Sequence, residues 1–151
     1  MLYCAYGSNM NLDQMAYRCP KSKVVGNGKI YGWDLVFNVH ADIVKADKDS
    51  FVPVVVWDID DDDDWAMLDM YEGYPDYYIR AGVNVEFDDG HNDVAIVYVM
   101  ANNRKGIYPP AQYYFDCIEQ GYIDNGIDTD CLYDALEHSY DNETEHNQYS
   151  L

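Results

Sequence analysis

Basic residues are scarce in this chain. Its 151 residues include only 9 lysines and arginines against 28 aspartates and glutamates, so the formal net charge at pH 7 is −19. A surface of this sign repels a phosphate backbone, and we therefore expect no direct binding to nucleic acid. The acidity favours solubility, and the alternative interpretation is that it attracts a basic protein partner.

Long apolar runs and clustered metal ligands are also lacking. Runs such as 54–57 are far shorter than the roughly 20 residues that a membrane-spanning helix needs. The first five residues contain no basic leader or cleavage site, so we expect a cytoplasmic protein that does not bind membranes. No two of the four cysteines form a C-x-x-C pair, and the four histidines show no H-E-x-x-H or zinc-finger spacing. We therefore expect free thiols and no metal site.

The remaining composition is that of a folded protein. Hydrophobic residues make up 48% of the chain, and no Gly/Ser- or Pro-rich linker divides it. We expect one domain over residues 1–138, followed by a polar and flexible tail over 139–151. The patterns predict strands over 2–6, 23–37, 51–59, 77–87 and 93–100. They predict helices over 11–18, 60–71, 111–120 and 130–138, with Gly121 ending the third of these. This order favours a mixed α+β fold, a strand-dominated sheet or partial barrel with helices packed on it.

The first candidate for chemistry is the segment Tyr6-Gly7-Ser8-Asn9. It follows a predicted strand, and Gly7 allows unusual backbone dihedrals without adding a side chain. Successive backbone N–H groups can converge in such a turn and bind a carboxylate or an oxyanion. The alternative is a plain connection between a strand and a helix.

The second candidate is Glu72, at the end of the predicted helix 60–71. It follows Trp65 by seven residues and Leu68 by four, so the three side chains share one helical face. If that face packs on the core, the carboxylate is desolvated, its pKa rises, and it becomes a candidate general acid and base. The alternative is that Glu72 turns out to water before Gly73.

Other patterns are weaker. The acidic run 58–64 begins like a calcium-binding loop, but Asp63 stands at the position of the required glycine and Asp69 at that of the bidentate glutamate. A solvated helix start explains the run better. Ser8 does not lie in a G-x-S-x-G elbow, and Cys4 has no basic neighbour that would activate it, so neither is expected to be a nucleophile.

Taken together, these segments resemble the γ-glutamylcyclotransferase-like (AIG2-like) family. The opening Leu-Tyr-Cys-Ala-Tyr-Gly-Ser-Asn-Met (2–10) is similar to the start of these proteins, and Arg-Cys-Pro (18–20) follows at the family's spacing. The segment Leu-Asp-Met-Tyr-Glu-Gly-Tyr-Pro (68–75) resembles the end of its catalytic helix, and the segment after Pro109 resembles its C-terminal helix. The resemblance covers residues 2–136. It implies a small, partly closed β-barrel with flanking helices and no cofactor.

The resemblance also implies roles for individual residues. Glu72 would be the general acid and base, and the segment 6–9 would hold the substrate. Tyr78 and Tyr113 match tyrosines that line the family's pocket. The substrate would be a small γ-glutamyl compound, cyclised by its own α-amine to 5-oxoproline with release of an amine or amino acid. A non-catalytic protein that uses the same pocket, or its acidic surface, for binding is the alternative.

Two positions depart from the family pattern. Val54 stands where the family usually has glycine, and Pro110 where it often has serine. Both positions border the pocket region in the family, so these departures bear on the identity of the substrate more than on the fold.

Overall fold

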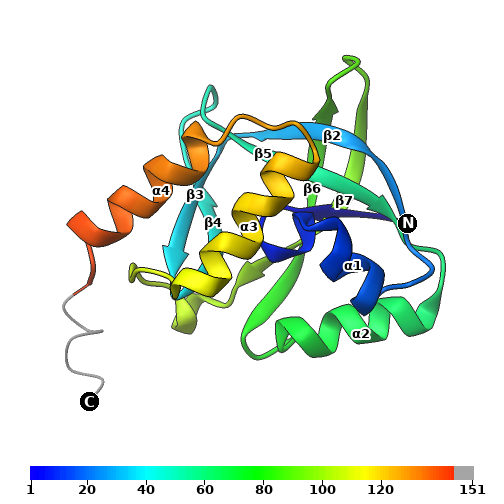
Figure 1. Ribbon diagram of the computed structural model, residues 1–151, viewed down its shortest axis with the longest axis horizontal. Helices are drawn as coiled ribbons and strands as arrows, with labels where there is room; N and C mark the ends of the chain where they lie inside the picture. Colours follow the sequence, from blue (N-terminus) through cyan, green and yellow to red (C-terminus); the bar gives the residue numbers. More distant parts are fainter. Residues whose placement is uncertain (145–151) are drawn as a thin grey trace.

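The computed structural model describes residues 1–144 and shows a closed barrel of five strands with helices around it (Figure 1). The strands follow one another around the barrel in the order β1-β5-β2-β6-β7, and β3 and β4 form a separate two-stranded ribbon. The barrel strands are β1 (Leu2–Ala5), β2 (Lys23–Tyr31), β5 (Phe51–Asp58), β6 (Tyr78–Phe87) and β7 (Asn92–Met100), and the ribbon strands are β3 (Trp33–Asn38) and β4 (His40–Lys45). The helices are α1 (Leu12–Arg18), α2 (Asp62–Glu72), α3 (Gln112–Asp124) and α4 (Asp130–Asp141), with 3-10 turns η1 (Ser8–Met10) and η2 (Asn102–Arg104). The expected α+β barrel with flanking helices is confirmed, and the barrel closes fully.

The short strand β1 closes the barrel. It pairs antiparallel with β5 over its whole length and parallel with β7 through Tyr3 and Ile96. Because both of its neighbours are strands, three of its four residues are buried, which explains an apolar run without alternation. The chain leaves β1 directly into η1, so the barrel fixes where that turn begins.

The ends of α1 and α2 follow from their caps. The Asn11 side chain accepts a hydrogen bond from the Gln14 N–H at 3.0 Å and starts α1. The Asp61 side chain accepts from the N–H groups of Asp63 and Asp64 and starts α2 one residue later, at Asp62. The acidic run is therefore a helix start, where the helix dipole favours carboxylates. Gly73, with a φ of 64°, ends α2.

The C-terminal helices are longer than expected. Gly121 does not end α3, which continues to Asp124. A Cβ atom at position 121 would lie 2.7 Å from the backbone nitrogen of Asn11, so the glycine lets α3 touch the backbone around η1. The second helix, α4, reaches Asp141 and buries Ser139, so the expected start of a tail at residue 139 is wrong. The rest of that expected tail, from residue 145, lies outside the described residues.

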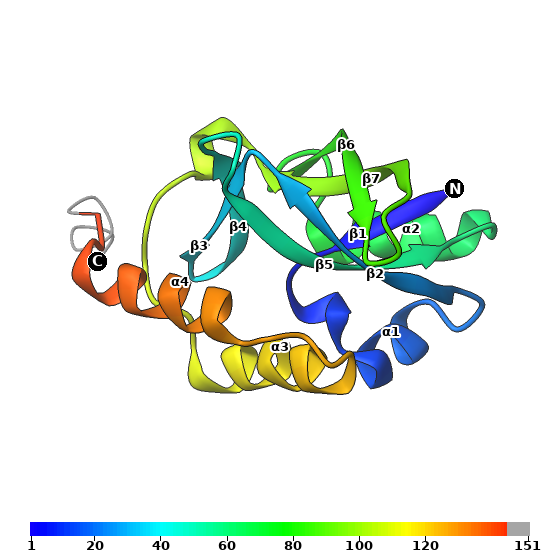
Figure 2. The ribbon, with the colours of Figure 1, turned by 90° about the horizontal axis from the view of Figure 1, so that it is seen from above.

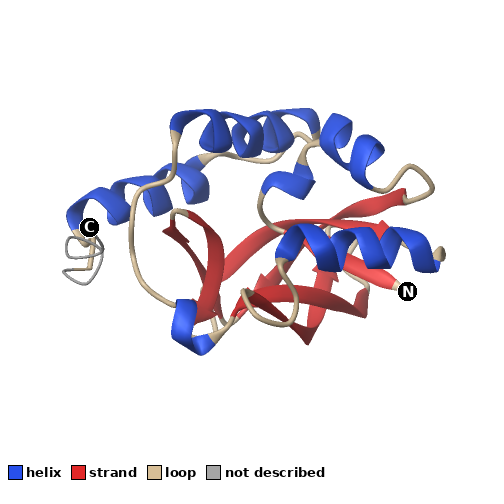
Figure 3. Cartoon of the chain, turned by 90° about the horizontal axis from the view of Figure 1, so that it is seen from below, coloured by secondary structure: helices blue, strands red, loops and turns tan. Residues whose placement is uncertain are grey.

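The helices lie outside the strands (Figure 3). Seen from above, α1, α3 and α4 run along one side of the strands (Figure 2). Within residues 1–144, no helix is long and apolar enough to cross a membrane.

The strand β4, over a stretch for which the sequence indicated no element, pairs with β3 and lies next to β7. The segments around η1, α1, β4, the end of α2 and α3 thereby come together at one place.

Candidate active site

A cavity of about 530 Å³ lies where these segments meet. Its wall contains half of the chain's sixteen tyrosines: Tyr3, Tyr6, Tyr71, Tyr77, Tyr78, Tyr98, Tyr113 and Tyr114. Among the lining residues, Glu72 is the one carboxylate and Arg18 the one arginine or lysine. The cavity is therefore an aromatic pocket with one carboxyl group and one guanidinium group.

Glu72 is the last residue of α2 and faces this cavity. Leu68, one turn earlier, is fully buried, which turns the same helical face, and Glu72 with it, inward. No side chain of residues 1–144 hydrogen-bonds or ion-pairs with its carboxylate. Burial raises the pKa of Glu72 to about 7, and the nearby Arg18 partly opposes that rise. A carboxyl group with this pKa can both take and return a proton near neutral pH.

Arg18 links the end of α1 to the loop at the cavity. Its guanidinium donates to Asn9 Oδ1 at 2.7 Å and lies 4.3 Å from the centre of the Tyr71 ring. Its Nη1 is also 3.5 Å from Ser8 Oγ. Arg18 was not predicted as a site residue, because in the sequence it stood out only as part of the Arg-Cys-Pro motif. Its charge at the end of a short helix after the loop was the available signal.

All four residues of the predicted substrate loop line the cavity. Ser8 and Asn9 open η1, where no earlier turn supplies acceptors for their N–H groups. The side chain of Asn9 is buried and donates to Tyr3 Oη at 2.9 Å, so it holds the loop in place. A Cβ atom at Gly7 would lie 3.3 Å from Ala41 Cβ and 3.6 Å from Tyr114 Oη. Only a glycine leaves this part of the wall open.

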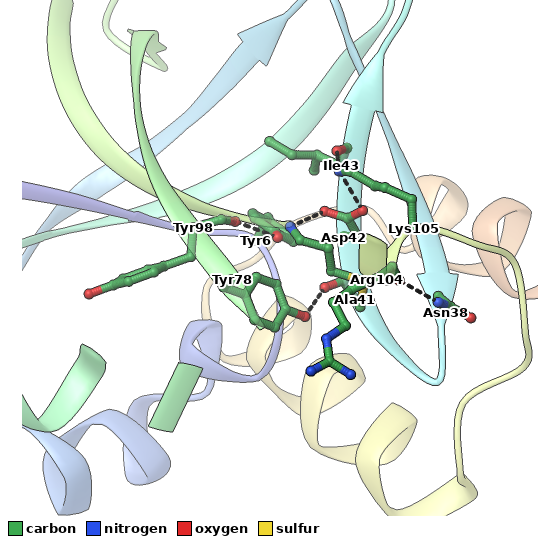
Figure 4. A network of polar contacts seen from close by, with 10 residues as sticks. Tyr6, Asn38, Ala41, Asp42, Ile43, Tyr78, Tyr98, Arg104 and Lys105 are labelled. Carbon is green, nitrogen blue, oxygen red and sulfur yellow. Dashed lines mark hydrogen bonds and ion pairs between the residues drawn. The ribbon is translucent and has the colours of Figure 1, made fainter. Parts of the chain in front are cut away.

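The first residue of that loop, Tyr6, connects the loop to the barrel. It is buried, and its hydroxyl donates to the backbone oxygen of Tyr98 at 2.6 Å (Figure 4). Its proton is thereby engaged within the protein. The ring of Tyr6 forms part of the wall, while its hydroxyl ties the loop to β7.

Strand β4 positions two more tyrosines of the wall. Tyr78 Oη donates to the Ala41 oxygen at 2.5 Å (Figure 4), and the Ala41 N–H donates to Tyr114 Oη at 3.0 Å. The next residue, Asp42, is 1% exposed and accepts from the Met100 N–H at 2.9 Å and from Lys105 Nζ at 2.7 Å. The buried Asp42 carboxylate, paired with the partly exposed Lys105, anchors β4 to the barrel and fixes Ala41 between the two hydroxyl groups.

Of two neighbouring tyrosines in α3, Tyr114 faces the cavity and Tyr113 lies at its rim. Tyr113 borders the cavity but is 80% exposed, so it lies at the rim. Tyr114, one residue on, points inward and makes the bond to Ala41. Sequence patterns alone did not separate the two, because residues 113–115 are all aromatic. The contact from β4, far away in the sequence, determines which of them faces the cavity.

Two further residues, His40 and Cys4, line the cavity, and the two positions that depart from the family pattern do not. Partial burial lowers the pKa of His40 from the usual value of a histidine. Burial raises the pKa of the Cys4 thiol, in agreement with the expectation that it is no nucleophile. Val54 and Pro110 are buried but do not belong to the cavity wall. Within residues 1–144, no three acidic, histidine or cysteine side chains form a group that could hold a metal ion.

Comparison with known families gives a match over residues 3–116 to the one described as "Gamma-glutamyl cyclotransferase, AIG2-like". The chain belongs to this family. The resemblance noted in the sequence is thereby confirmed. Among curated protein sequences, the comparison yields no match.

Solved structures show the same fold. One named "Gamma-glutamyl cyclotransferase" has a TM-score of 0.75 and 23% identity, covering 100% of this chain and 91% of its own. An uncharacterized protein from Homo sapiens has a TM-score of 0.72 and 24% identity, covering 95% of this chain and 88% of its own. YkqA from Bacillus subtilis has a TM-score of 0.74 and 20% identity, with coverage of 95% and 55%. At these identities the similarity establishes the cyclotransferase-like fold.

Proposed function

We propose that this chain is a γ-glutamylcyclotransferase-type enzyme, which releases 5-oxoproline and a free amine or amino acid from a γ-glutamyl compound. The observation that carries the proposal is Glu72, an unpaired carboxyl group with a pKa of about 7 inside a cavity of about 530 Å³. A protein that only binds a ligand gains nothing from burying a carboxylate without a partner. An enzyme that must move a proton does gain from such a carboxylate, because burial brings its pKa close to neutral pH.

Glu72 serves both halves of the reaction. Its carboxylate takes a proton from the substrate's α-ammonium group, and the resulting amine attacks the γ-carbonyl carbon. A carbon–nitrogen bond forms, and the carbonyl electron pair moves to oxygen. When the oxyanion collapses, the bond to the original γ-nitrogen breaks, and Glu72 returns the proton to that nitrogen. The attacking nitrogen passes its second proton to the departing amine, which leaves as an ammonium ion, so the step balances without any further reactant.

The loop and the tyrosines supply position and electrostatic stabilisation. The N–H groups of Ser8 and Asn9 bind the α-carboxylate or the developing oxyanion, because they lie at the cavity and open the turn η1. Tyr78 and Tyr114, both fixed by Ala41, shape the wall against which the substrate bends. Closing a five-membered ring is intramolecular, so holding the bent conformer accounts for much of the acceleration.

The test is the release of 5-oxoproline from a panel of γ-glutamyl amino acids, γ-glutamylamines and glutathione. Glu72→Gln should lower the rate by about 10²–10⁴-fold, because the amide keeps the shape but takes no proton. Glu137→Gln, an exposed glutamate on α4, is the matched control and should keep the wild-type rate. The proposal fails if the wild-type chain releases no 5-oxoproline from any donor. Glu72 is not the base if Glu72→Gln retains more than a tenth of the activity.

A further inference from the structure

Gln14 places an unused hydrogen-bond donor at the cavity. It lies in α1 and lines the cavity together with Cys117 of α3. Its Nε2 atom is buried and has no hydrogen-bond partner within residues 1–144. Buried amide groups are nearly always hydrogen-bonded, since leaving one unpaired lowers stability. A donor in this state beside a ligand cavity indicates an acceptor that arrives with the ligand.

The orientation of the Gln14 amide is set by Cys117. Cys117 Sγ lies 3.5 Å from Gln14 Oε1, and the thiol S–H donates to this oxygen. With its oxygen engaged by α3, the amide presents its NH₂ group to other partners. Burial raises the pKa of Cys117, so the thiol keeps the proton that this bond requires.

Gln14 and Cys117 line the same cavity as the reacting carboxyl group. Arg18 lowers the pKa of both Glu72 and Cys117, and Glu72 and Cys117 both raise that of Tyr114. Arg18 and Tyr114 therefore lie close enough to both groups to interact with them electrostatically. Because Glu72 and Gln14 line one cavity, a substrate whose α-amine contacts Glu72 can extend its other end to Gln14. Cavities of about 300–1,000 Å³ hold ligands larger than a glutamyl group, so 530 Å³ leaves room for that end.

We propose that the Gln14 amide binds an acceptor oxygen, a carboxylate or carbonyl, on the group that leaves, and so selects among γ-glutamyl donors. This inference rests on the proposed function. It predicts that donors with a carboxylate next to the scissile nitrogen bind better than donors of the same shape without one. A site built to bond a polar group discriminates strongly against analogues that lack it.

Two donors make the comparison direct. γ-Glutamyl-α-aminobutyrate and γ-glutamyl-n-propylamine differ only in the carboxylate of the leaving part. Gln14→Leu should lower kcat/KM for the first about 10-fold and change that for the second less than twofold. Gln14→Glu replaces the donor by a negative acceptor and should lower kcat/KM for the first about 100-fold. Gln120→Leu, on the exposed face of α3, is the matched control and should change neither value.

Cys117 provides a second readout. Cys117→Ala frees the amide to turn and should lower kcat/KM for the aminobutyrate donor about threefold. Cys117→Ser keeps a donor to Gln14 and should restore it. A merely structural role for Cys117 would affect both donors equally, and that result would contradict the orientation argument.

Measuring donor binding without turnover tests this inference independently of the proposed function. Calorimetry with the Glu72→Gln chain measures the Kd of both donors without turnover. A tighter Kd for the aminobutyrate donor that is lost in Glu72→Gln/Gln14→Leu supports the inference even if the wild-type chain forms no 5-oxoproline. Equal Kd values for the two donors, equal losses with both donors in Gln14→Leu, or no binding of either donor would overturn it.

Discussion

Glu72→Gln should stabilise the folded chain at neutral and alkaline pH while it removes turnover. In the unfolded chain the carboxyl group loses its proton around its ordinary pKa of 4.5, whereas burial raises the pKa of Glu72 to about 7 in the fold. The folded state thus holds the proton more tightly, and the free energy of unfolding falls as pH rises from 4.5 to about 7. At about 1.36 kcal/mol for each pH unit, the full effect is about 3 kcal/mol above pH 7. Glutamine does not ionise and avoids this loss.

Urea denaturation of both chains at two pH values measures the effect. The advantage of Glu72→Gln should be about 1 kcal/mol at pH 5.5 and about 3 kcal/mol at pH 8. Glu137→Gln controls for the loss of one charge from so acidic a surface, and its effect should be within about 0.5 kcal/mol at both values. An advantage of Glu72→Gln that is the same at pH 5.5 and pH 8 would refute the reasoning. The carboxyl group would then ionise alike in both states.

Three further outcomes are expected. The kcat/KM for 5-oxoproline release should rise with pH and reach half its plateau near the Glu72 pKa of about 7; a midpoint near 4.5 would mean that an exposed carboxyl group is the base. Gly7→Val should weaken ligand binding by the folded fraction, because the valine side chain would crowd Ala41 and Tyr114 in the cavity wall. Ser8→Ala should have a milder effect. Unimpaired ligand affinity of the folded Gly7→Val chain would contradict the loop assignment. Lys105→Met should lower the free energy of unfolding by about 3 kcal/mol in urea titrations, since it leaves Asp42 without its ion-pair partner. Asp42→Asn in the same chain should restore part of the lost stability. A loss below about 1 kcal/mol would show that the pair does not anchor β4.

Local patterns were sufficient to predict much of the site. The Glu72 carboxyl group faces inward because Leu68, one turn before it, is a core residue, and a spacing of four is visible in any sequence. Gly73 likewise marks the end of α2 locally, whereas the helix begins at Asp62, after the Asp61 cap, and not at residue 60 as predicted. Signals of this kind need no knowledge of the rest of the chain.

What could not be predicted depends on contacts between distant segments. Strand β4 contains the buried charge of Asp42, which no strand pattern favours, and Lys105 that compensates it lies 63 residues away. The choice between Tyr113 and Tyr114 depends in turn on β4, because the Ala41 N–H selects the second. A single sequence does not show which of its residues meet across such separations.

The glycine inside α3 has a consequence for engineering. With Gly121, the helix backbone rests on that of Met10 and Asn11, and a Cβ atom there would lie 2.7 Å from both. Tyr114 and Cys117 lie on the same helix, two turns and one turn before it. A side chain at position 121 would therefore push the helix and both of these residues away from the loop. A substitution at Gly121, which does not line the cavity, would thus change the width of the cavity between α3 and η1 while Glu72 itself stays unchanged.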